Sequence, residues 1–158
     1  MTERSTVHAT FTIERHYLAT PERVFRAFAD PVAKARWFIG PEAWVKAEHD
    51  IDFRVGGAEH LRILSVDGDA HVFDATYHDI VPDRRIVYAY QMHVGETRLS
   101  VSLATIELEA VGDGSRLLFT EQAAFLDGND NVGDRQAGTE ALLDHLGDEV
   151  EGRSNGSA

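Results

Sequence analysis

The chain has 158 residues, of which 43% are hydrophobic and 27% are charged, and its formal net charge is −12 at pH 7. This length suits a single domain with a sizeable core, and the hydrophobic share is too high for a disordered chain. The acidic excess would repel phosphate backbones and anionic lipid surfaces, so we expect neither nucleic acid nor a membrane as a partner.

The chain contains no cysteine, which excludes disulfides, thiolate metal sites and cysteine nucleophiles. Its first residues lack the apolar run of a secretory signal, and no apolar stretch approaches the length of a membrane span. We therefore expect a cytoplasmic protein that is a monomer or a homodimer. We also expect one domain over residues 8–151, with flexible termini at 1–7 and 152–158.

The first part of the chain predicts a strand followed by two short helices. Apolar and polar residues alternate over 9–18, as in a strand with one buried face. Thr20 and Pro21 then suit the N-cap and first position of a helix. Pro31 ends that helix, because proline disfavours helical geometry at the residue before it. A second helix is expected over 31–38.

The sequence from residue 43 onward favours strands separated by short turns. The expected strands cover 44–45, 53–55, 59–64, 72–80, 85–92, 98–110 and 116–124. Their short connections predict an antiparallel meander, since parallel strands need long crossovers. After a polar loop at 127–131, apolar residues at helical spacing predict a C-terminal helix. We expect an α+β fold in which helices cover one face of the sheet.

Seven short segments, taken in chain order, resemble one known family. They are Ile13-Glu14-Arg15, Thr20-Pro21-Glu22-Arg23-Val24-Phe25, Trp37-Phe38, Arg54-Val55-Gly56-Gly57, Pro82-Asp83-Arg84-Arg85-Ile86-Val87-Tyr88, Gly114-Ser115-Arg116-Leu117 and Leu142-Leu143-Asp144-His145-Leu146. Together they resemble the bacterial homologues of the heat-shock-protein-90 ATPase activator, within the START-like (SRPBCC) superfamily. The resemblance implies a helix-grip fold, in which a curved antiparallel sheet wraps a long C-terminal helix and an apolar cavity lies between them.

The resemblance leaves the function open, because this superfamily includes lipid and hormone carriers, aromatic polyketide cyclases and ring-hydroxylase domains. Members of this branch often carry Gly-Trp at the start of the last helix, whereas here Gly138 is followed by Thr139. An aromatic side chain expected at the cavity or its lid is therefore missing. The additional domain of the eukaryotic co-chaperone is also missing, so we do not carry over an action on a chaperone ATPase.

Large apolar side chains on the expected helices and strands would either line the cavity or fill the core, which is the commoner place for such residues. Tyr88 and Tyr90 share one strand face, so both would point into the same space. We expect a small apolar ligand, such as a lipid or an aromatic molecule, and no cofactor. The candidate ligand-binding residues are Trp37, Trp44, Phe53, Phe73, Tyr77, Tyr88, Tyr90, Met92, Phe119, Glu121, Leu142 and Leu146.

Two acidic residues, Glu107 and Glu121, interrupt apolar strands. An outward position is the commoner placement of such a residue, whereas a desolvated carboxylate could act as a general acid or base, which makes Glu121 the candidate catalytic residue. The eight histidines lack the spacing of metal ligands, so we expect no metal site. His60 and His93 have apolar neighbours and are the two that we expect to add polarity to a pocket.

The sequence therefore favours a domain that binds a small apolar or aromatic molecule between its sheet and its last helix. One alternative is a protein-interaction module with a filled core, such as a stress or chaperone accessory. Another is a cyclase-type or hydrolase-type enzyme that uses Glu121 or a pocket histidine. Ligand binding predicts an enclosed cavity of a few hundred Å³, whereas a filled interior would favour the interaction module.

Overall fold

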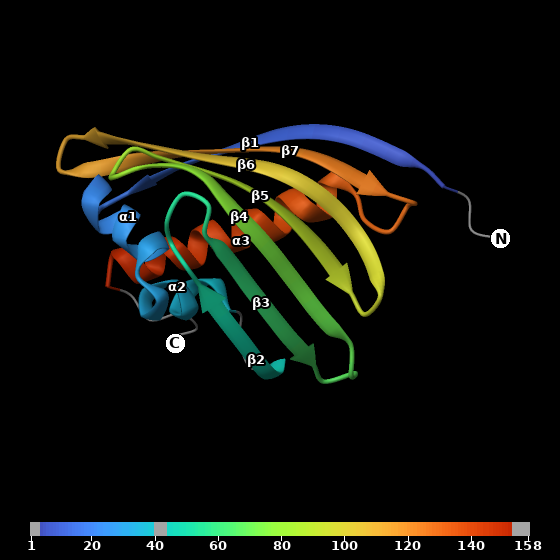
Figure 1. Ribbon diagram of the computed structural model, residues 1–158. Helices are drawn as coiled ribbons and strands as arrows, with labels where there is room; N and C mark the ends of the chain where they lie inside the picture. The colour runs from blue at the N-terminus through green and yellow to red at the C-terminus, as the bar shows by residue number, and fades with distance from the viewer. Residues whose placement is uncertain (1–3, 40–43, 153–158) are drawn as a thin grey trace.

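The structure, a computed structural model, describes residues 4–39 and 44–152, with side chains described from residue 47 in the second segment. Its main element is a curved, seven-stranded antiparallel sheet with the order β1-β7-β6-β5-β4-β3-β2 (Figure 1). The strands are β1 (Thr6–Tyr17), β2 (Trp44–Ile51), β3 (Ala58–Ser65), β4 (Ala70–Val81), β5 (Arg85–Val94), β6 (Thr97–Val111) and β7 (Gly114–Leu126). This arrangement confirms the predicted α+β meander and the helix-grip fold.

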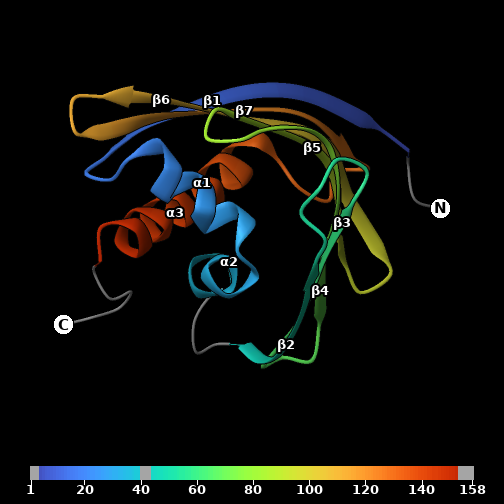
Figure 2. The same ribbon diagram turned by 60° about the vertical axis from the view of Figure 1, so that its left-hand side comes forward.

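Three helices lie on the concave side of the sheet: α1 (Pro21–Ala29), α2 (Pro31–Phe38) and α3 (Val132–Val150). Figure 2 shows that α3 runs along the sheet, while α1 and α2 lie beside the C-terminal half of α3. The long helix therefore packs against β1 of the sheet and against both short helices, and α1 also contacts β6 and β7.

The short helices begin and end where the sequence predicts. The side chain of Thr20 accepts a hydrogen bond from the backbone N–H of Arg23 at 3.3 Å and caps α1. Asp30 caps α2 in the same way by accepting from the backbone N–H of Val32 at 3.2 Å. Because a proline follows each cap, no N–H group is left unpaired at the first helical position.

The strand predicted over 53–55 is wrong, because these residues form the turn between β2 and β3. Gly56 adopts a φ of +85°, which favours glycine. A Cβ atom on Gly57 would lie 2.0 Å from the carbonyl oxygen of Asp52, so the two backbone segments approach too closely for any other residue. The chain therefore bends sharply here, and β2 extends to Ile51 instead of ending at residue 45.

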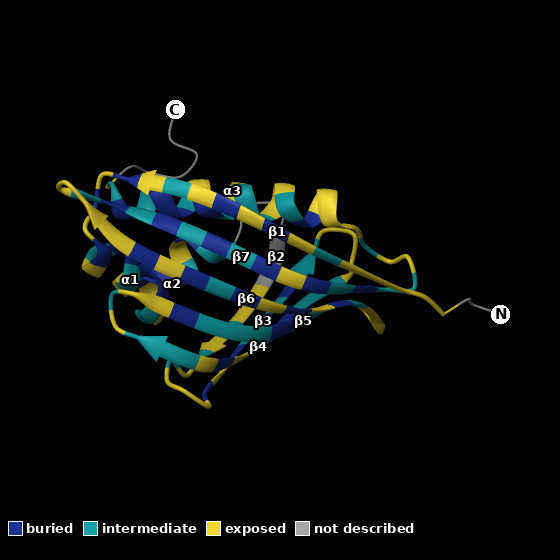
Figure 3. Ribbon diagram, turned by 90° about the horizontal axis from the view of Figure 1, so that it is seen from above, coloured by how far each residue is buried: buried dark blue, intermediate teal, exposed yellow. Residues whose placement is uncertain are grey.

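Along β1, β3, β6 and β7, buried residues alternate with more exposed ones, so that one face of the sheet is buried and the other is exposed (Figure 3). On β6, for example, Ser102 and Ala104 are buried while Val101 and Leu103 are exposed. The alternation gives the sheet one apolar face, and the three helices cover part of it. No helix in the described ranges is long and apolar enough to cross a membrane.

Candidate ligand-binding site

A cavity of about 470 Å³ lies between the concave face of the sheet and helices α2 and α3. Its wall is mostly apolar, and its size is in the range of small-molecule sites. The lining residues are Phe28, Trp37, Phe38, Leu61, Ile63, His71, Val72, Phe73, Tyr88, Tyr90, Met92, Phe119, Glu121, Asp130, Asp134, Arg135, Gly138, Thr139, Ala141, Leu142, Leu143 and His145. The expectation of an enclosed cavity is wrong, since this one opens to solvent.

The structure brings eight of the predicted ligand-binding residues into the cavity wall. They are Trp37, Phe73, Tyr88, Tyr90, Met92, Phe119, Glu121 and Leu142. Three others lie outside that wall: Phe53 packs against Phe25 and Tyr77, Tyr77 is buried beneath Phe53, and Leu146 is fully buried in the core. The side chain of Trp44 lies outside the described residues.

The aromatic part of the wall comes from neighbouring strands. The rings of Phe73 on β4 and Tyr90 on β5 have centroids 4.9 Å apart, and Tyr88 lies 5.9 Å from Tyr90 along the same strand. Phe38 of α2 extends this surface, with its ring edge-on to Phe73 at 5.1 Å. Such contacts fix the positions of the rings, so the wall presents a continuous apolar surface to a ligand.

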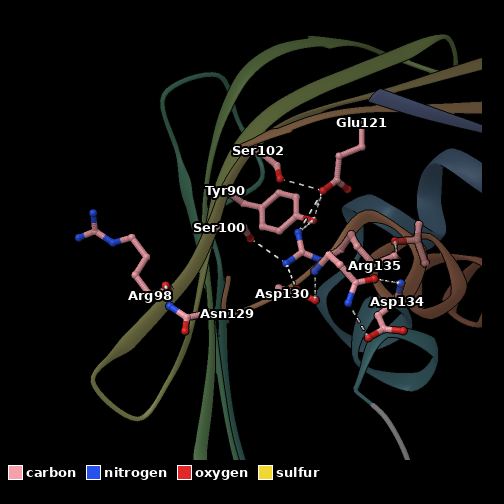
Figure 4. A network of polar contacts seen from close by, with 11 residues as sticks. Tyr90, Arg98, Ser100, Ser102, Glu121, Asn129, Asp130, Asp134 and Arg135 are labelled. Carbon is pink, nitrogen blue, oxygen red and sulfur yellow. Dashed lines mark hydrogen bonds and ion pairs between the residues drawn. The ribbon is translucent and has the colours of Figure 1, made fainter. Parts of the chain in front are cut away.

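A buried polar cluster contributes Tyr90, Glu121 and Arg135 to the cavity wall (Figure 4). The Oε2 atom of Glu121 accepts hydrogen bonds from the Tyr90 hydroxyl and the Ser102 hydroxyl, each at 2.8 Å. It also accepts one from Nη1 of Arg135 at 3.1 Å. The other carboxylate oxygen, Oε1, is buried and has no hydrogen-bond partner among the described residues. Glu121 is 0% exposed, so this oxygen has lost bulk water without gaining a donor.

Arg135, from the first turns of α3, joins this cluster to the loop before the helix. Its Nη1 also donates to the Tyr90 hydroxyl at 3.0 Å, and its Nη2 donates to Ser100 Oγ and to Asp130 Oδ2, each at 2.7 Å. Burial alone would lower the pKa of Arg135, but Tyr90, Glu121 and Asp130 outweigh burial and raise it. The guanidinium is therefore charged, and both terminal nitrogens are already engaged.

The tyrosine hydroxyls of the cavity keep their protons at neutral pH. Burial is the main reason that the pKa of Tyr88 is raised well above its ordinary value, and Tyr90 and Glu121 raise it further. Burial and the carboxylate of Glu121 likewise raise the pKa of Tyr90, which acts as a hydrogen-bond donor to that carboxylate. Both hydroxyl groups are therefore neutral, and that of Tyr90 is already hydrogen-bonded to Glu121 and Arg135.

A second buried carboxylate, Glu59, lies on the concave face of β3 outside the cavity wall. Its Oε1 accepts from Lys34 Nζ at 3.0 Å and from the Tyr77 hydroxyl at 2.5 Å, and its Oε2 lies 2.7 Å from His49 Nε2. Burial alone would raise the pKa of Glu59, but Lys34, His49 and Tyr77 together lower it to about 2. The ammonium of Lys34 also lies 4.3 Å from the ring centroid of Phe38, so this cluster fixes α2 beside the cavity.

The two acids that interrupt apolar strands are placed differently. Glu107 is exposed, as expected of an acid on a strand, but the outward position is wrong for Glu121, which faces the core. The histidines that line the cavity are His71 and His145, whereas His60 pairs with Asp74 at 2.5 Å outside it. His93, like His60, does not contribute to the cavity wall.

The sequence predictions missed Arg135, Glu59 and Lys34. Arg135 precedes Leu142 by seven residues, and this spacing puts both on one face of a helix. That signal could have placed Arg135 in the cavity wall. Among the described residues, no group of three or more His, Asp or Glu side chains is arranged to hold a metal ion.

Comparison with known proteins identifies relatives of this fold. Residues 18–151 match the family model described as "Activator of Hsp90 ATPase homolog 1-like protein". A solved structure of a protein from Rhizobium leguminosarum is 48% identical with a TM-score of 0.91, and the match covers 95% of this chain and 99% of that one. Protein Mll3558 from Rhizobium loti is also 48% identical, with a TM-score of 0.86 and coverage of 92% and 99%.

More distant relatives share the fold alone. The AHSA1-like protein from Aeromonas hydrophila is 21% identical with a TM-score of 0.71, and the match covers 91% of this chain and 93% of that one. A search of curated proteins found no match.

Proposed function

We propose that this chain, which belongs to the activator of Hsp90 ATPase homolog 1-like family, binds a small apolar or aromatic molecule in the cavity between its sheet and α3. The observation that carries the proposal is the cavity itself, with a volume of about 470 Å³ and seven aromatic side chains of Phe, Tyr or Trp in its wall. A protein-interaction module with a filled core would not contain such a cavity.

Burial of apolar surface would supply most of the binding free energy, at about 25 cal/mol per Å² removed from water. Because the wall is fixed by ring contacts and by two buried polar clusters, little ordering is needed when a ligand enters. The polar side chains in the wall, which include Tyr90 and Arg135, would set the orientation of the ligand. The proposal is therefore a preformed apolar site with one polar anchor.

Gly138 provides a direct test, because it lines the cavity and a Cβ atom added there would meet nothing within 4 Å. The substitution Gly138→Trp should place an indole in the cavity without a backbone clash. Ala137→Trp is the matched control, since Ala137 is exposed on the same helix and lies outside the cavity wall. Both variants should unfold within a few degrees of the unsubstituted protein.

The probe is N-phenyl-1-naphthylamine, a neutral dye whose fluorescence rises in apolar surroundings. We expect binding with a Kd of roughly micromolar order, since ligands of this size gain at most about 0.3–1.5 kcal/mol per heavy atom. Gly138→Trp should weaken binding by about tenfold or more, which corresponds to about 1.4 kcal/mol, whereas Ala137→Trp should leave it unchanged. Equal binding by both variants, or no binding by the unsubstituted protein, would refute the proposal.

A further inference from the structure

The aromatic wall of the cavity contains one hydroxyl group that the fold itself does not use. Among the described lining residues, the Trp and Tyr side chains are Trp37, Tyr88 and Tyr90. Trp37 Nε1 donates to the backbone oxygen of Ala27 at 2.9 Å, and the Tyr90 hydroxyl donates to Glu121 at 2.8 Å. The Tyr88 hydroxyl, in contrast, makes no hydrogen bond with any described residue.

The Tyr88 hydroxyl is also within reach of a molecule in the cavity. Tyr88 lies two residues from Ile86 and from Tyr90, which are buried, so the period of two puts its side chain on the same concave face. Unlike these neighbours, Tyr88 is partly exposed, and it lines the open cavity. Its oxygen is not one of the buried side-chain atoms that lack a partner in the described ranges, which are His93 Nε2, Ser115 Oγ and Glu121 Oε1. Since the hydroxyl is unpaired but not sealed off, a ligand can contact it directly.

Packing and burial make this hydroxyl a positioned hydrogen-bond donor. The Tyr88 ring lies edge-on to the Tyr77 ring at 5.9 Å and to the Phe73 ring at 6.4 Å, so its orientation is fixed. Burial raises the pKa of Tyr88 well above its ordinary value, and Tyr90 and Glu121 raise it further. The phenol therefore keeps its proton at neutral pH and has that proton to donate. A ligand with an acceptor oxygen at this position would receive the hydrogen bond.

The charges in the wall favour an acceptor that is neutral. The described lining residues include three carboxylates, from Glu121, Asp130 and Asp134, and one guanidinium, from Arg135. Both terminal nitrogens of Arg135 already donate to protein oxygens. A ligand carboxylate would add a negative charge beside these acids, in a chain of net charge −12, and would lose its hydration on entry. A carbonyl oxygen accepts the same hydrogen bond without either cost.

We propose that the cavity takes a neutral aromatic carbonyl compound, and that Tyr88 donates a hydrogen bond to its carbonyl oxygen. This inference rests on the proposed function, because it assigns the polar group of a ligand that the cavity must first bind. The aromatic body lies against the surface formed by Phe38 and Phe73, whose rings meet edge-on beside Tyr88. Tyr88 is then the residue that distinguishes a carbonyl ligand from a hydrocarbon of the same shape.

Three naphthalene derivatives test the assignment in the full chain at pH 7.5, through displacement of N-phenyl-1-naphthylamine. In 2-isopropenylnaphthalene a methylene group replaces the carbonyl oxygen of 2-acetylnaphthalene, so the shape is kept and the acceptor is lost. The third ligand, 2-naphthoate, has acceptor oxygens at the same place but carries a negative charge. We expect both neutral ligands to bind, and 2-naphthoate to bind at least about tenfold more weakly than 2-acetylnaphthalene.

The variant Tyr88→Phe removes the hydroxyl and keeps the ring. It should bind 2-acetylnaphthalene about fivefold more weakly, which corresponds to the usual contribution of one hydrogen bond, without losing affinity for 2-isopropenylnaphthalene. Tyr17→Phe is the matched control, since Tyr17 lies outside the cavity wall and its hydroxyl donates to the backbone oxygen of Leu143 at 2.8 Å. The control should leave the affinities for both ligands unchanged.

The carbonyl stretch of the bound ligand gives a second measurement, which needs no variant. In an isotope-edited infrared spectrum, the labelled carbonyl of bound 2-acetylnaphthalene should absorb at lower wavenumber than in hexane, and Tyr88→Phe should return it towards the hexane value. If neither neutral ligand displaces the dye, the proposed function itself fails. If they bind but the carbonyl absorbs as in hexane, if Tyr88→Phe weakens both ligands alike or neither, or if 2-naphthoate binds as tightly as 2-acetylnaphthalene, the proposed function stands and the carbonyl assignment is overturned.

Discussion

Removal of the Lys34 ammonium should destabilise the protein strongly, because it leaves Glu59 as a buried charge without its counter-ion. The Lys34 and Glu59 side chains are 5% and 1% exposed, and their charged atoms lie 3.0 Å apart. Breaking a buried ion pair by removing one partner typically costs about 3–5 kcal/mol. The pKa of Glu59 is lowered from 4.5 to about 2, so Lys34, together with His49 and Tyr77, outweighs burial in favouring the charged carboxylate.

The test is urea unfolding of Lys34→Met, followed by far-UV circular dichroism, at pH 7 and at lower pH. Arg36→Met is the control, because Arg36 lies on the same helix and pairs with Glu149 at 2.7 Å, with the Arg36 side chain 53% exposed and that of Glu149 11% exposed. Because water still solvates the guanidinium of this pair, the control should lose less than Lys34→Met. A double variant, Lys34→Met with Glu59→Gln, should lose less than Lys34→Met alone, since no buried charge remains.

The pH dependence separates this explanation from a simple loss of packing. In the unsubstituted protein the folded-state pKa of Glu59 is depressed, so its contribution is present above about pH 4.5 and is lost as the pH falls towards about 2. In Lys34→Met, burial acts without the ammonium and should raise the pKa of Glu59, so that mild acid neutralises the charge. The difference between the two proteins should therefore shrink on acidification. A loss at pH 7 no larger than that of Arg36→Met, or a difference independent of pH, would refute the reasoning.

Three further substitutions test the local structure. Asn131→Ala removes the side chain that accepts from the backbone N–H of Asp134 at 2.9 Å, and urea unfolding should show a loss of about 1 kcal/mol; an unchanged midpoint would contradict its role as the cap of α3. Gly138→Ala should raise the melting temperature by about 2–4 °C, because alanine favours the helix by about 0.8–1 kcal/mol and its Cβ meets no atom within 4 Å; a fall would contradict this open placement. Gly57→Ala should lower the unfolding free energy by more than about 1 kcal/mol, since its Cβ would lie 2.0 Å from a backbone oxygen, and an unchanged value in urea would show that the turn can relax.

The alternation along the strands already indicated where the two acids lie. On β7, Glu121 is in phase with Phe119 and Ala123, which are buried, so the period of two puts its side chain on the concave face. On β6, Glu107 lies between the buried Ile106 and Leu108, so the same period puts it outside. The general preference of acids for the surface suggested an outward position for both residues, and for Glu121 the phase of the strand prevailed.

Other features could not be obtained from local pattern. The turn at 53–57 depends on the close approach of Gly57 to Asp52. The aromatic and β-branched residues in this segment are typical of a strand and do not indicate that approach. Whether Leu142 or Leu146 lines the cavity depends on where α3 crosses the sheet, since the two lie one turn apart on the same helix face. Such facts arise from the packing of distant segments, and a single sequence contains no direct signal for them.

The two buried glutamates join different parts of the fold. Both oxygens of Glu59 accept hydrogen bonds or ion-pair contacts from Lys34, His49 and Tyr77, so this carboxylate ties α2 to β2, β3 and β4. Glu121 is equally buried, and its Oε2 accepts from Tyr90, Ser102 and Arg135. Since buried polar groups are normally hydrogen-bonded, this second carboxylate ties α3 to β5, β6 and β7.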